Sequence, residues 1–405
     1  MKRPSVPGSR QVLSTGSGHR QPHSDDVRGR GLSGPRPRVQ GPWSTAGVFV
    51  AVLLGILIVA AVPLLTAAPA RVTRPNGVTA HRAHSTRPAA AVHRAHAPGP
   101  TAVHRAHATL PAAVFGADRH VFGLSPSTGP QGAAQVREVE HLLGRQIRLV
   151  NFYSGWAYPS FDARALDSID ALGAVPEVTW EPWNYRLGTK QHLYALSRIV
   201  AGNFDGFIRS WAKAAAAWGR PLLLRFAQEM NGDWYPWGAA VNGNKPNEYV
   251  LAYRHIHNIF RAVGATNVIW IWSPNVLYPG GVNLSSVYPG NAYVSWIGVD
   301  GYNWGTSVPR KGGWRSPTAV FVPTLDALKR VAPTKPIMIS ETASAEQGGS
   351  KAAWITELFK LLTHYPSVQA VSWFNYEKKG TDWQITSSEA SVRAMANSLA
   401  KFWRR

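Results

Sequence analysis

Apolar and polar residues alternate with two different periods between residues 113 and 405. Short apolar runs typical of strands occur at His120–Leu124, Ile147–Phe152, Val175–Thr179, Leu222–Ala227, Val268–Trp272, Trp296–Gly301, Ile337–Ser340 and Ala370–Phe374. Longer amphipathic runs typical of helices separate them, among them Ala133–Leu143, Phe204–Trp218, Asn247–Val263, Ala352–Thr363 and Ala390–Phe402. This order predicts an α/β protein, in which helices connect parallel strands.

Eight predicted strands and about as many helices favour a (β/α)8 TIM barrel for residues 113–405, because such a barrel needs roughly 250 residues. An open, doubly wound sheet is the alternative fold. No glycine-rich turn of the kind that binds phosphate follows any of the predicted strands, and this absence favours the barrel.

One stretch outside the predicted barrel is hydrophobic throughout. Residues 44–68 carry no charge and supply the roughly 20 apolar residues that a membrane-spanning helix needs. Basic residues predominate upstream, which by the positive-inside rule keeps the N-terminus in the cytoplasm. We therefore expect a single-pass cell-membrane protein whose barrel lies outside the cytoplasm. The alternative is a signal peptide cleaved near Thr66–Ala70, which would release a secreted protein.

The segments on either side of the predicted anchor have the composition of disordered chain. Residues 1–43 form a basic tail rich in Gly, Pro, Ser and Arg, and residues 69–112 form a linker of Ala, Pro, His and Arg. The linker repeats His-Arg-Ala-His three times, first at residues 81–84. Because an arginine stands inside each repeat, we expect a solvated basic linker rather than a metal site, and attraction to an anionic wall or lipid is the other alternative.

Composition narrows the possible partners and chemistry. The net charge is +21, but fourteen Lys and Arg residues and only two acids lie in the first 110 residues, so more than half of the net charge lies outside the barrel. The 17 tryptophans are not interleaved with basic clusters, and we therefore expect no nucleic-acid partner. The absence of cysteine excludes disulfides, thiolate metal sites and cysteine nucleophiles.

Two glutamates come at the ends of predicted strands. Glu229 lies two residues beyond the fourth strand, and Glu341 directly follows the seventh. Because side chains alternate along a strand, we expect Glu229 on the face of Arg225 and Glu341 on the face of Ile337 and Ile339, all directed at the barrel axis. The reacting groups of TIM barrels lie at the C-terminal ends of the strands, where these two carboxyl groups can meet.

A pair of carboxyl groups at a barrel mouth is what glycoside hydrolysis requires. A separation of ~5–5.5 Å gives retention of configuration and ~6.5–9.5 Å gives inversion, and the sequence does not set this distance. For a single glutamate at a strand end, the alternative is a surface or ion-paired role. Arg225 is expected inside the barrel, where a buried arginine needs a partner, and it can either be paired structurally or tune the carboxylates. Glu181 can also reach the mouth.

Aromatic residues gather just after the predicted strands, where loops run over the surface. They include Trp180, Trp183, Trp234, Tyr235, Trp237, Tyr302, Trp304 and Trp373. Aromatic faces offer a large apolar contact that suits the C–H faces of pyranose rings. Core packing is the alternative for any one of them, but a set on surface loops indicates a sugar site.

Three motifs resemble those of glycoside hydrolase family 26. Residues 225–238, RFAQEMNGDWYPWG, resemble its acid/base segment, residues 296–304 its sixth strand and residues 335–342 its nucleophile strand. The family is best known for β-mannanases and also includes β-glucanases and xylanases. The resemblance extends over about residues 115–400, and the three motifs occur in order on strands four, six and seven.

The resemblance implies catalytic roles for three residues. Glu229 would be the acid/base and Glu341 the nucleophile of a retaining mechanism, which uses no metal and no organic cofactor. Tyr302 would position Glu341 and help to ionise it.

The resemblance also implies a set of substrate-binding residues. Trp373 would form part of the sugar platform, and Trp234 and Trp237 would line the site beside the acid/base. Trp304, the last residue of the sixth-strand motif, is a further candidate for binding substrate. Gln228 stands where family members often carry His, at a position that meets the sugar near its 2-hydroxyl. This departure leaves the choice between mannose and glucose open.

The expected function is hydrolysis of a β-1,4-linked polysaccharide by a monomeric enzyme similar to mannan endo-1,4-β-mannosidases. One alternative is a β-glucanase or an exopolysaccharide-processing hydrolase of the same family. Another is a carbohydrate-binding protein without catalytic activity. The expected partners are the polysaccharide and, through the N-terminal helix, the membrane.

Overall fold

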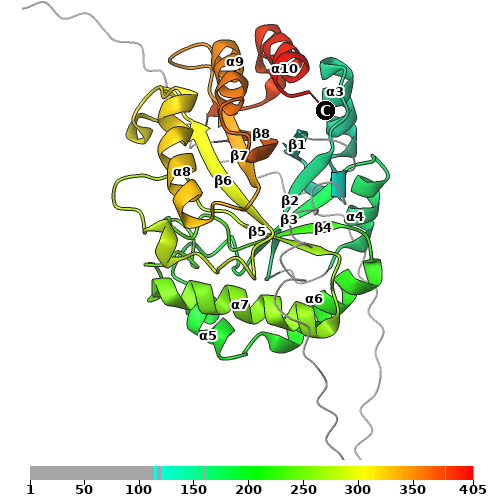
Figure 1. Cartoon of the computed structure of the whole chain (residues 1–405), viewed down its shortest axis with the longest axis vertical. Coiled ribbons are helices and arrows are strands. Elements are labelled where there is room, and N and C mark those ends of the chain that lie inside the picture. The colour runs from blue at the N-terminus through cyan, green and yellow to red at the C-terminus, as the bar shows by residue number, and fades with distance from the viewer. Residues whose placement is uncertain (1–113, 116–119, 158–160, 379, 405) are drawn as a thin grey trace, which may run out of the picture. The chain divides into compact units, whose positions relative to one another are not determined.

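The barrel domain is described by a computed structural model over residues 114–115, 120–157, 161–378 and 380–404. Eight parallel strands close into a barrel in chain order, which confirms the predicted TIM-barrel fold (Figure 1). The strands are β1 Val121–Pro126, β2 Leu149–Gly155, β3 Val175–Glu181, β4 Leu222–Phe226, β5 Val268–Trp272, β6 Trp296–Asn303, β7 Ile337–Ser344 and β8 Val368–Asn375. Each of the eight predicted strands overlaps one of these.

Helices surround the barrel and bury their apolar sides against it. They are α3 Ala133–Leu143, α4 Ala163–Asp170, α5 Leu196–Val200, α6 Asp205–Trp218, α7 Pro246–Val263, α8 Pro317–Val331, α9 Lys351–Leu362 and α10 Glu389–Phe402. Short elements lie in the connecting loops, namely η1 Gly129–Gln131, η2 His192–Tyr194, η3 Leu284–Ser286, η4 Pro309–Lys311, η5 Ile385–Ser387 and the hairpin of β9 Glu377–Lys378 and β10 Thr381–Asp382. Both η4 and the hairpin follow strands, and they therefore lie at the C-terminal end of the barrel.

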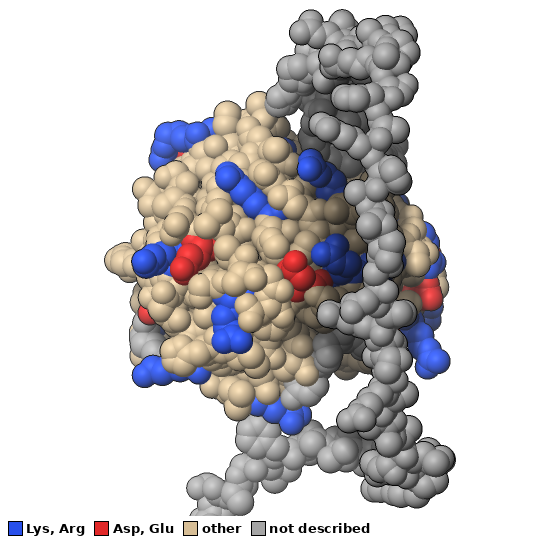
Figure 2. Space-filling model, turned by 90° about the horizontal axis from the view of Figure 1, so that it is seen from below, with Lys and Arg blue, Asp and Glu red and all other residues tan. Residues whose placement is uncertain are grey.

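The charged residues of the domain are dispersed on one of its faces. Figure 2 shows the side on which α5, α6 and α7 lie in Figure 1. Lys and Arg side chains lie apart from one another there, and several lie beside Asp or Glu. The part of this face that is visible in Figure 2 therefore presents no continuous basic patch.

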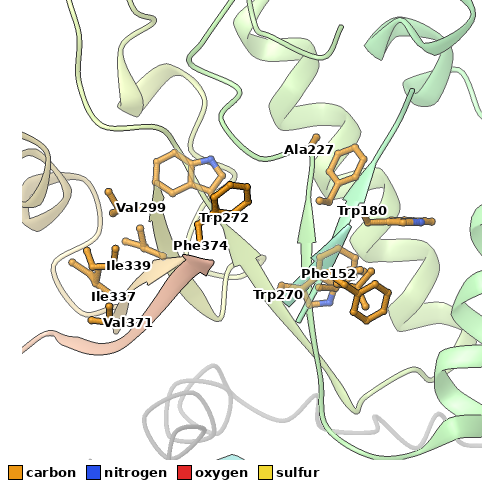
Figure 3. Close-up of a cluster of buried hydrophobic side chains, with 14 of the residues drawn as sticks. Phe152, Trp180, Ala227, Trp270, Trp272, Val299, Ile337, Ile339, Val371 and Phe374 are labelled. Atoms are coloured by element: carbon orange, nitrogen blue, oxygen red, sulfur yellow. The ribbon is translucent and has the colours of Figure 1, made fainter. Parts of the chain in front are cut away.

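The barrel wall separates two apolar layers. The outer layer lies between strands and helices and includes Phe152, Trp180 and Trp270 (Figure 3). The inner layer fills the lower part of the barrel, where Leu223 and Met338 pack with the other residues of this cluster, Phe115, Val121, Leu149, Ile269, Ile271, Trp296 and Ala370. Burial of these two layers supplies the main favourable free energy of folding.

A polar layer lies inside the barrel above the inner apolar one. Asn151, Glu177, Thr179, Arg225 and Asp300 are all fully buried there. A buried charge needs a partner, and these side chains are hydrogen-bonded or ion-paired with one another. The polar layer places the only described buried arginine directly beneath the mouth of the barrel.

The prediction that Ile337, Ile339 and Glu341 share one face of β7 is wrong. Ile337 and Ile339 belong to the outer apolar layer, as Figure 3 shows. Val299 of β6 pairs with Ile339, but the next residue of β6 pairs with Glu341, so β7 contains one extra residue. Such a bulge interrupts the period of two and turns the following side chain to the other face. Glu341 therefore points into the barrel, as expected, but for a different reason.

The prediction that β4 continues in extended form to Glu229 is also wrong. The strand ends at Phe226, and Ala227 and Glu229 adopt left-handed backbone conformations with φ of 49° and 54°. Their amides are nevertheless held, because Ala227 donates to the carbonyl of Trp180 (3.1 Å) and Glu229 to that of Ser273 (2.7 Å). Left-handed conformations cost non-glycine residues about 1 kcal/mol or more each, and they cluster at functional sites.

Among the described residues, no helix combines the length and the apolar character that crossing a membrane requires. The predicted basic tail, anchor and linker, with the His-Arg-Ala-His repeats, all lie at residues 1–112 and so outside the part of the chain that the structure describes.

Candidate active site

Glu341 at the mouth of the barrel is held as a carboxylate. Its Oε1 accepts hydrogen bonds from the hydroxyl of Tyr153 (2.6 Å) and from Nη2 of Arg225, and its Oε2 accepts one from the hydroxyl of Tyr302. Burial by itself would raise the pKa of Glu341, but the charge of Arg225 and these hydrogen bonds outweigh burial and lower the pKa below its ordinary value. Glu341 is therefore ionised at neutral pH.

Glu229 has the opposite electrostatic environment. Its Oε1 accepts a hydrogen bond from Nδ2 of Asn275 (2.6 Å), and its Oε2 accepts one from Nε1 of Trp234 (2.5 Å). Burial, followed by the negative charge of Glu341, raises the pKa of Glu229 to about 7. The two hydrogen bonds oppose this rise without cancelling it. A substantial fraction of Glu229 is therefore protonated at neutral pH.

The two carboxyl groups lie within electrostatic reach of each other across the mouth. The charge of Glu341 is the second largest cause of the raised pKa of Glu229. Each is almost completely buried, with 7% of Glu229 and 6% of Glu341 exposed. Two carboxyl groups whose environments push their pKa values apart are the usual sign of an acid and a nucleophile in one site.

Arg225 connects the polar interior to Glu341. Its Nη1 donates to both carboxylate oxygens of Asp300 (2.9 and 3.0 Å), and its Nε and Nη2 donate to the hydroxyl of Thr179. Its Nε also lies 3.6 Å from a carboxylate oxygen of Glu177. The sequence-based expectation that Arg225 is buried and ion-paired is confirmed. Its positive charge is the main reason that Glu341 stays ionised.

Replacing Arg225 by methionine should affect both stability and pH dependence. Loss of the buried cation leaves Asp300 and Glu341 without a counter-charge, which costs about 3–5 kcal/mol of unfolding free energy. Because Arg225 lowers the pKa of Glu341, its removal should also move the acid limb of kcat/KM to higher pH. Thermal unfolding and a pH profile measure the two effects.

The matched control for this variant is Arg220→Met. Arg220 pairs with Asp167 and Asp170 at the surface, and its side chain is 42% exposed. It should leave both the unfolding temperature and the pH profile close to those of the wild type. An Arg225→Met variant that behaves like this control would show that the buried network does not set the ionisation of Glu341.

A third carboxyl group lies beside the acid/base candidate. Oε1 of Glu181, at the end of β3, accepts a hydrogen bond from Nε2 of Gln228 (2.8 Å), and its Oε2 accepts one from Nε1 of Trp183 (3.2 Å). Burial raises the pKa of Glu181 to about 7. Glu181 thus fixes the side chain of Gln228, the residue that directly precedes Glu229.

The structure separates the predicted substrate-binding aromatics into two groups. Trp234, Tyr302 and Trp304 are partly exposed at the mouth. Trp237 is fully buried, and its Nε1 donates to the backbone carbonyl of Gln228 (2.6 Å). Trp373 is also fully buried and packs against Trp354 of α9.

The expectation that Trp373 forms part of a sugar platform is therefore wrong, because its ring lies on the helix side of the barrel wall. The expectation that Trp237 lines the site by direct contact is also wrong, because Trp237 is fully buried. Its indole instead holds the backbone of Gln228 through the hydrogen bond to the Gln228 carbonyl. Gln228 itself is fully buried in this structure, with its amide directed at Glu181.

Three site residues were not predicted. Tyr153 donates to Glu341, Asn275 donates to Glu229, and Trp383 stacks on Tyr302 with ring centroids 4.8 Å apart. A period of two from Asn151 along β2 would have placed Tyr153 on the inner face. Asn275 follows β5 closely, and its position at the C-terminal end of a strand was the available signal. Trp383 lies beyond the last strand and gave no such signal.

The described residues contain no group of three or more His, Asp or Glu side chains placed to hold a metal ion. The side chains around the two glutamates are hydrogen-bond donors and aromatic rings, and they suit a sugar better than a cation.

A closed β/α barrel whose mouth holds an ionised glutamate and a second glutamate of raised pKa has the architecture of a glycosidase. The family model "Glycosyl hydrolase family 26" matches residues 178–361, which contain both glutamates. The chain belongs to this family of O-glycosyl hydrolases, and the resemblance seen in the three motifs is confirmed.

Relatives of the chain include an endoglucanase and a mannan endo-1,4-beta-mannosidase. Endoglucanase H of Acetivibrio thermocellus is 38% identical over 277 residues, which is 67% of this chain and 29% of that protein. A mannan endo-1,4-beta-mannosidase of Bacillus subtilis is 33% identical over 89 residues, 21% of this chain and 24% of that protein. The chain thus spans less than a third of either relative.

Solved structures share the fold at low sequence identity. An endo-beta-1,4-mannanase of Cellulomonas fimi has a TM-score of 0.56 and 19% identity, with 74% of each chain covered. A GH26 beta-mannanase of Bacteroides ovatus has a TM-score of 0.54 and 16% identity over 74% of this chain and 93% of that one. These likenesses show that the barrel is the same fold.

Proposed function

We propose that the barrel domain hydrolyses a β-1,4-linked polysaccharide with retention of configuration, with Glu341 as nucleophile and Glu229 as acid/base. One observation carries this proposal, namely that the protein keeps Glu341 ionised and raises the pKa of Glu229 to about 7 at the same barrel mouth. A nucleophile must be charged and an acid must hold a proton, and the two environments meet these requirements.

In the first step, a carboxylate oxygen of Glu341 attacks the anomeric carbon. The bond from this carbon to the glycosidic oxygen breaks, and the carboxyl group of Glu229 donates its proton to the departing oxygen. Tyr153, Tyr302 and Arg225 hold the attacking carboxylate in position through the hydrogen bonds that they donate to it. The product of this step is a glycosyl ester of Glu341 and a free sugar hydroxyl.

The second step reverses the roles of acid and base. Formation of the ester removes the negative charge of Glu341, which was a cause of the raised pKa of Glu229. The pKa of Glu229 therefore falls at the stage when this residue must act as a base. Glu229 takes a proton from water, the water oxygen bonds to the anomeric carbon, and Glu341 leaves as a carboxylate that Arg225 stabilises.

The substrate we propose first is a β-mannan, with a β-glucan as the second candidate. Several curated relatives are mannan endo-1,4-beta-mannosidases, which supports the mannan. The longer and more identical match to an endoglucanase supports the glucan. Gln228 in place of the family's frequent histidine leaves the choice open.

Incubation of residues 110–405 with β-mannan, glucomannan, mixed-linkage β-glucan and xylan distinguishes these substrates. We expect release of oligosaccharides from mannan and glucomannan, read by chromatography of the products. Release from the mixed-linkage glucan alone would replace the mannan by the glucan. Binding of these glycans by the protein without release of any oligosaccharide would instead support a carbohydrate-binding protein without catalytic activity.

We also propose that residues 44–68 anchor the domain at the outer face of the cell membrane. The uncharged apolar stretch and its basic upstream flank support this location. Full-length protein should sediment with membranes and resist extraction by high salt, whereas residues 110–405 should remain in the soluble fraction. Recovery of the full-length product in the culture medium, shortened at its N-terminus, would instead indicate a cleaved signal peptide.

A further inference from the structure

Two lysines border the mouth of the barrel, each held over aromatic rings that support a catalytic glutamate. Nζ of Lys311, in η4, lies 5.1 Å from the ring centroid of Trp304 and 5.6 Å from that of Trp234. Trp234 donates the hydrogen bond to Glu229. The indole of Trp234 thus contacts both the ammonium group of Lys311 and the carboxyl group of Glu229.

The second lysine lies over a different ring of the same site. Nζ of Lys378, in β9, lies 5.8 Å from the ring centroid of Phe374. The Phe374 ring contacts the rings of Tyr302 and Tyr153, the two residues whose hydroxyls donate to Glu341. Lys311 and Lys378, the rim lysines, therefore come from the loops after β6 and β8 and border one site.

The rim lysines are exposed and carry charge that no carboxylate of the described residues neutralises. Among those residues, the lysines that form an ion pair with a carboxylate are Lys329 and Lys351. Glu377 is next to Lys378 in the hairpin, but it is itself exposed and makes no ion pair with a described lysine. The stacking of an ammonium group over aromatic rings keeps it at the mouth.

Resting on the proposed function, we propose that the rim lysines bind carboxylate groups of an acidic polysaccharide. The substrate would then carry uronic-acid or other carboxylated sugars close to the bond that is cleaved. Several carboxyl groups at the mouth would otherwise repel such a chain, because Glu341 is ionised and Glu229 and Glu181 are ionised in part. An ammonium group on either side offsets this repulsion and attracts the chain.

The test compares a charged polysaccharide with a neutral one of the same size. The probe is glucomannan in which part of the primary hydroxyls has been oxidised to carboxylates, and the neutral form is its methyl ester. For the full-length protein, kcat/KM on the acid is divided by kcat/KM on the ester. In the double variant Lys311→Met/Lys378→Met this ratio should fall about tenfold at low ionic strength, because two ion pairs are lost.

Two controls separate charge from packing. Lys401→Met removes an exposed lysine that also lies over an aromatic ring, that of Phe402, on the last helix and away from the mouth, and it should leave the ratio unchanged. The effect of the double variant should also shrink in about 0.5 M salt, where the Debye length is a few ångströms. Methionine keeps the apolar contact with the rings and removes only the charge.

A ratio that stays at the wild-type value in the double variant would overturn the inference while the proposed hydrolysis stands. Equal loss on both substrates would also overturn it, because the lysines would then serve neutral hydroxyls. If neither polysaccharide is cleaved, affinity electrophoresis in gels containing the oxidised glucomannan measures binding of the protein instead. If the wild type is then retarded more than the double variant, the acidic ligand is supported while the proposed hydrolysis fails. If both are retarded equally, the inference and the proposed hydrolysis are both overturned.

Discussion

Replacing Glu341 by glutamine is expected to lower kcat by roughly four orders of magnitude or more, because the amide cannot form the glycosyl ester. The isosteric amide keeps the space that Tyr153, Tyr302 and Arg225 surround, so the loss measures the nucleophile rather than packing. Steady-state hydrolysis of the substrate identified in the polysaccharide panel gives kcat. A variant that retains most of the wild-type kcat would remove Glu341 from the mechanism.

The same variant has a second expected effect, on Glu229. The charge of Glu341 is a cause of the raised pKa of Glu229, and its loss should move that pKa toward the ordinary value. Titration of the Glu229 carboxyl by NMR in wild type and variant measures this change. An unchanged pKa would mean that the two carboxyl groups do not interact across the mouth.

Replacing Glu229 by glutamine is expected to lower kcat/KM on a polysaccharide by roughly 10²- to 10⁴-fold, which is the usual contribution of a general acid. Wild-type kcat/KM should fall as the pH rises through about 7, because Glu229 must be protonated to donate. In the variant this basic limb should disappear. An aryl glycoside whose leaving group needs no proton should lose far less than the polysaccharide.

Stability provides the control for the Glu229 variant. The folded state raises the pKa of Glu229, so it binds a proton that the unfolded chain releases, and stability falls as the pH rises from the ordinary value to about 7. Glutamine has no such loss. The difference in unfolding temperature between pH 5 and pH 8 should therefore be smaller in Glu229→Gln than in the wild type. A variant destabilised at both pH values would mean that its lost activity reflects misfolding.

The barrel and its two glutamates could be predicted from the sequence because their signals are local. Eight apolar runs separated by amphipathic ones define the strands, and both glutamates follow strands that are easily recognised. The backbone geometry that orients them could not be predicted, because it depends on the extra residue in β7 and on the left-handed bend at Ala227 and Glu229. A bulge and a bend are set by pairing with neighbouring strands, which a single sequence does not reveal.

The sequence alone did not predict which aromatic residues lie at the site. Trp234 follows Glu229 and Trp373 comes near the end of the eighth predicted strand, and composition does not distinguish them. Trp234 is partly exposed and bonded to Glu229, whereas Trp373 faces the helices. The alternation along β8 decides the difference, since a residue next to an inward position points outward. Trp383, which does support the site, lies in an irregular segment between short elements.

The proposed mechanism requires that Glu341 form a covalent bond to the sugar and that Glu229 act as the acid/base at the same barrel mouth. Incubation with a 2-deoxy-2-fluoroglycoside of the identified sugar, carrying an activated leaving group, should trap this ester, because fluorine slows both steps while the good leaving group spares the first. Mass spectrometry should find the intact protein heavier by one fluoroglycosyl group, and the modified peptide should contain Glu341. A label on another residue would contradict the account, as would an active enzyme that forms no adduct and releases sugars of inverted configuration.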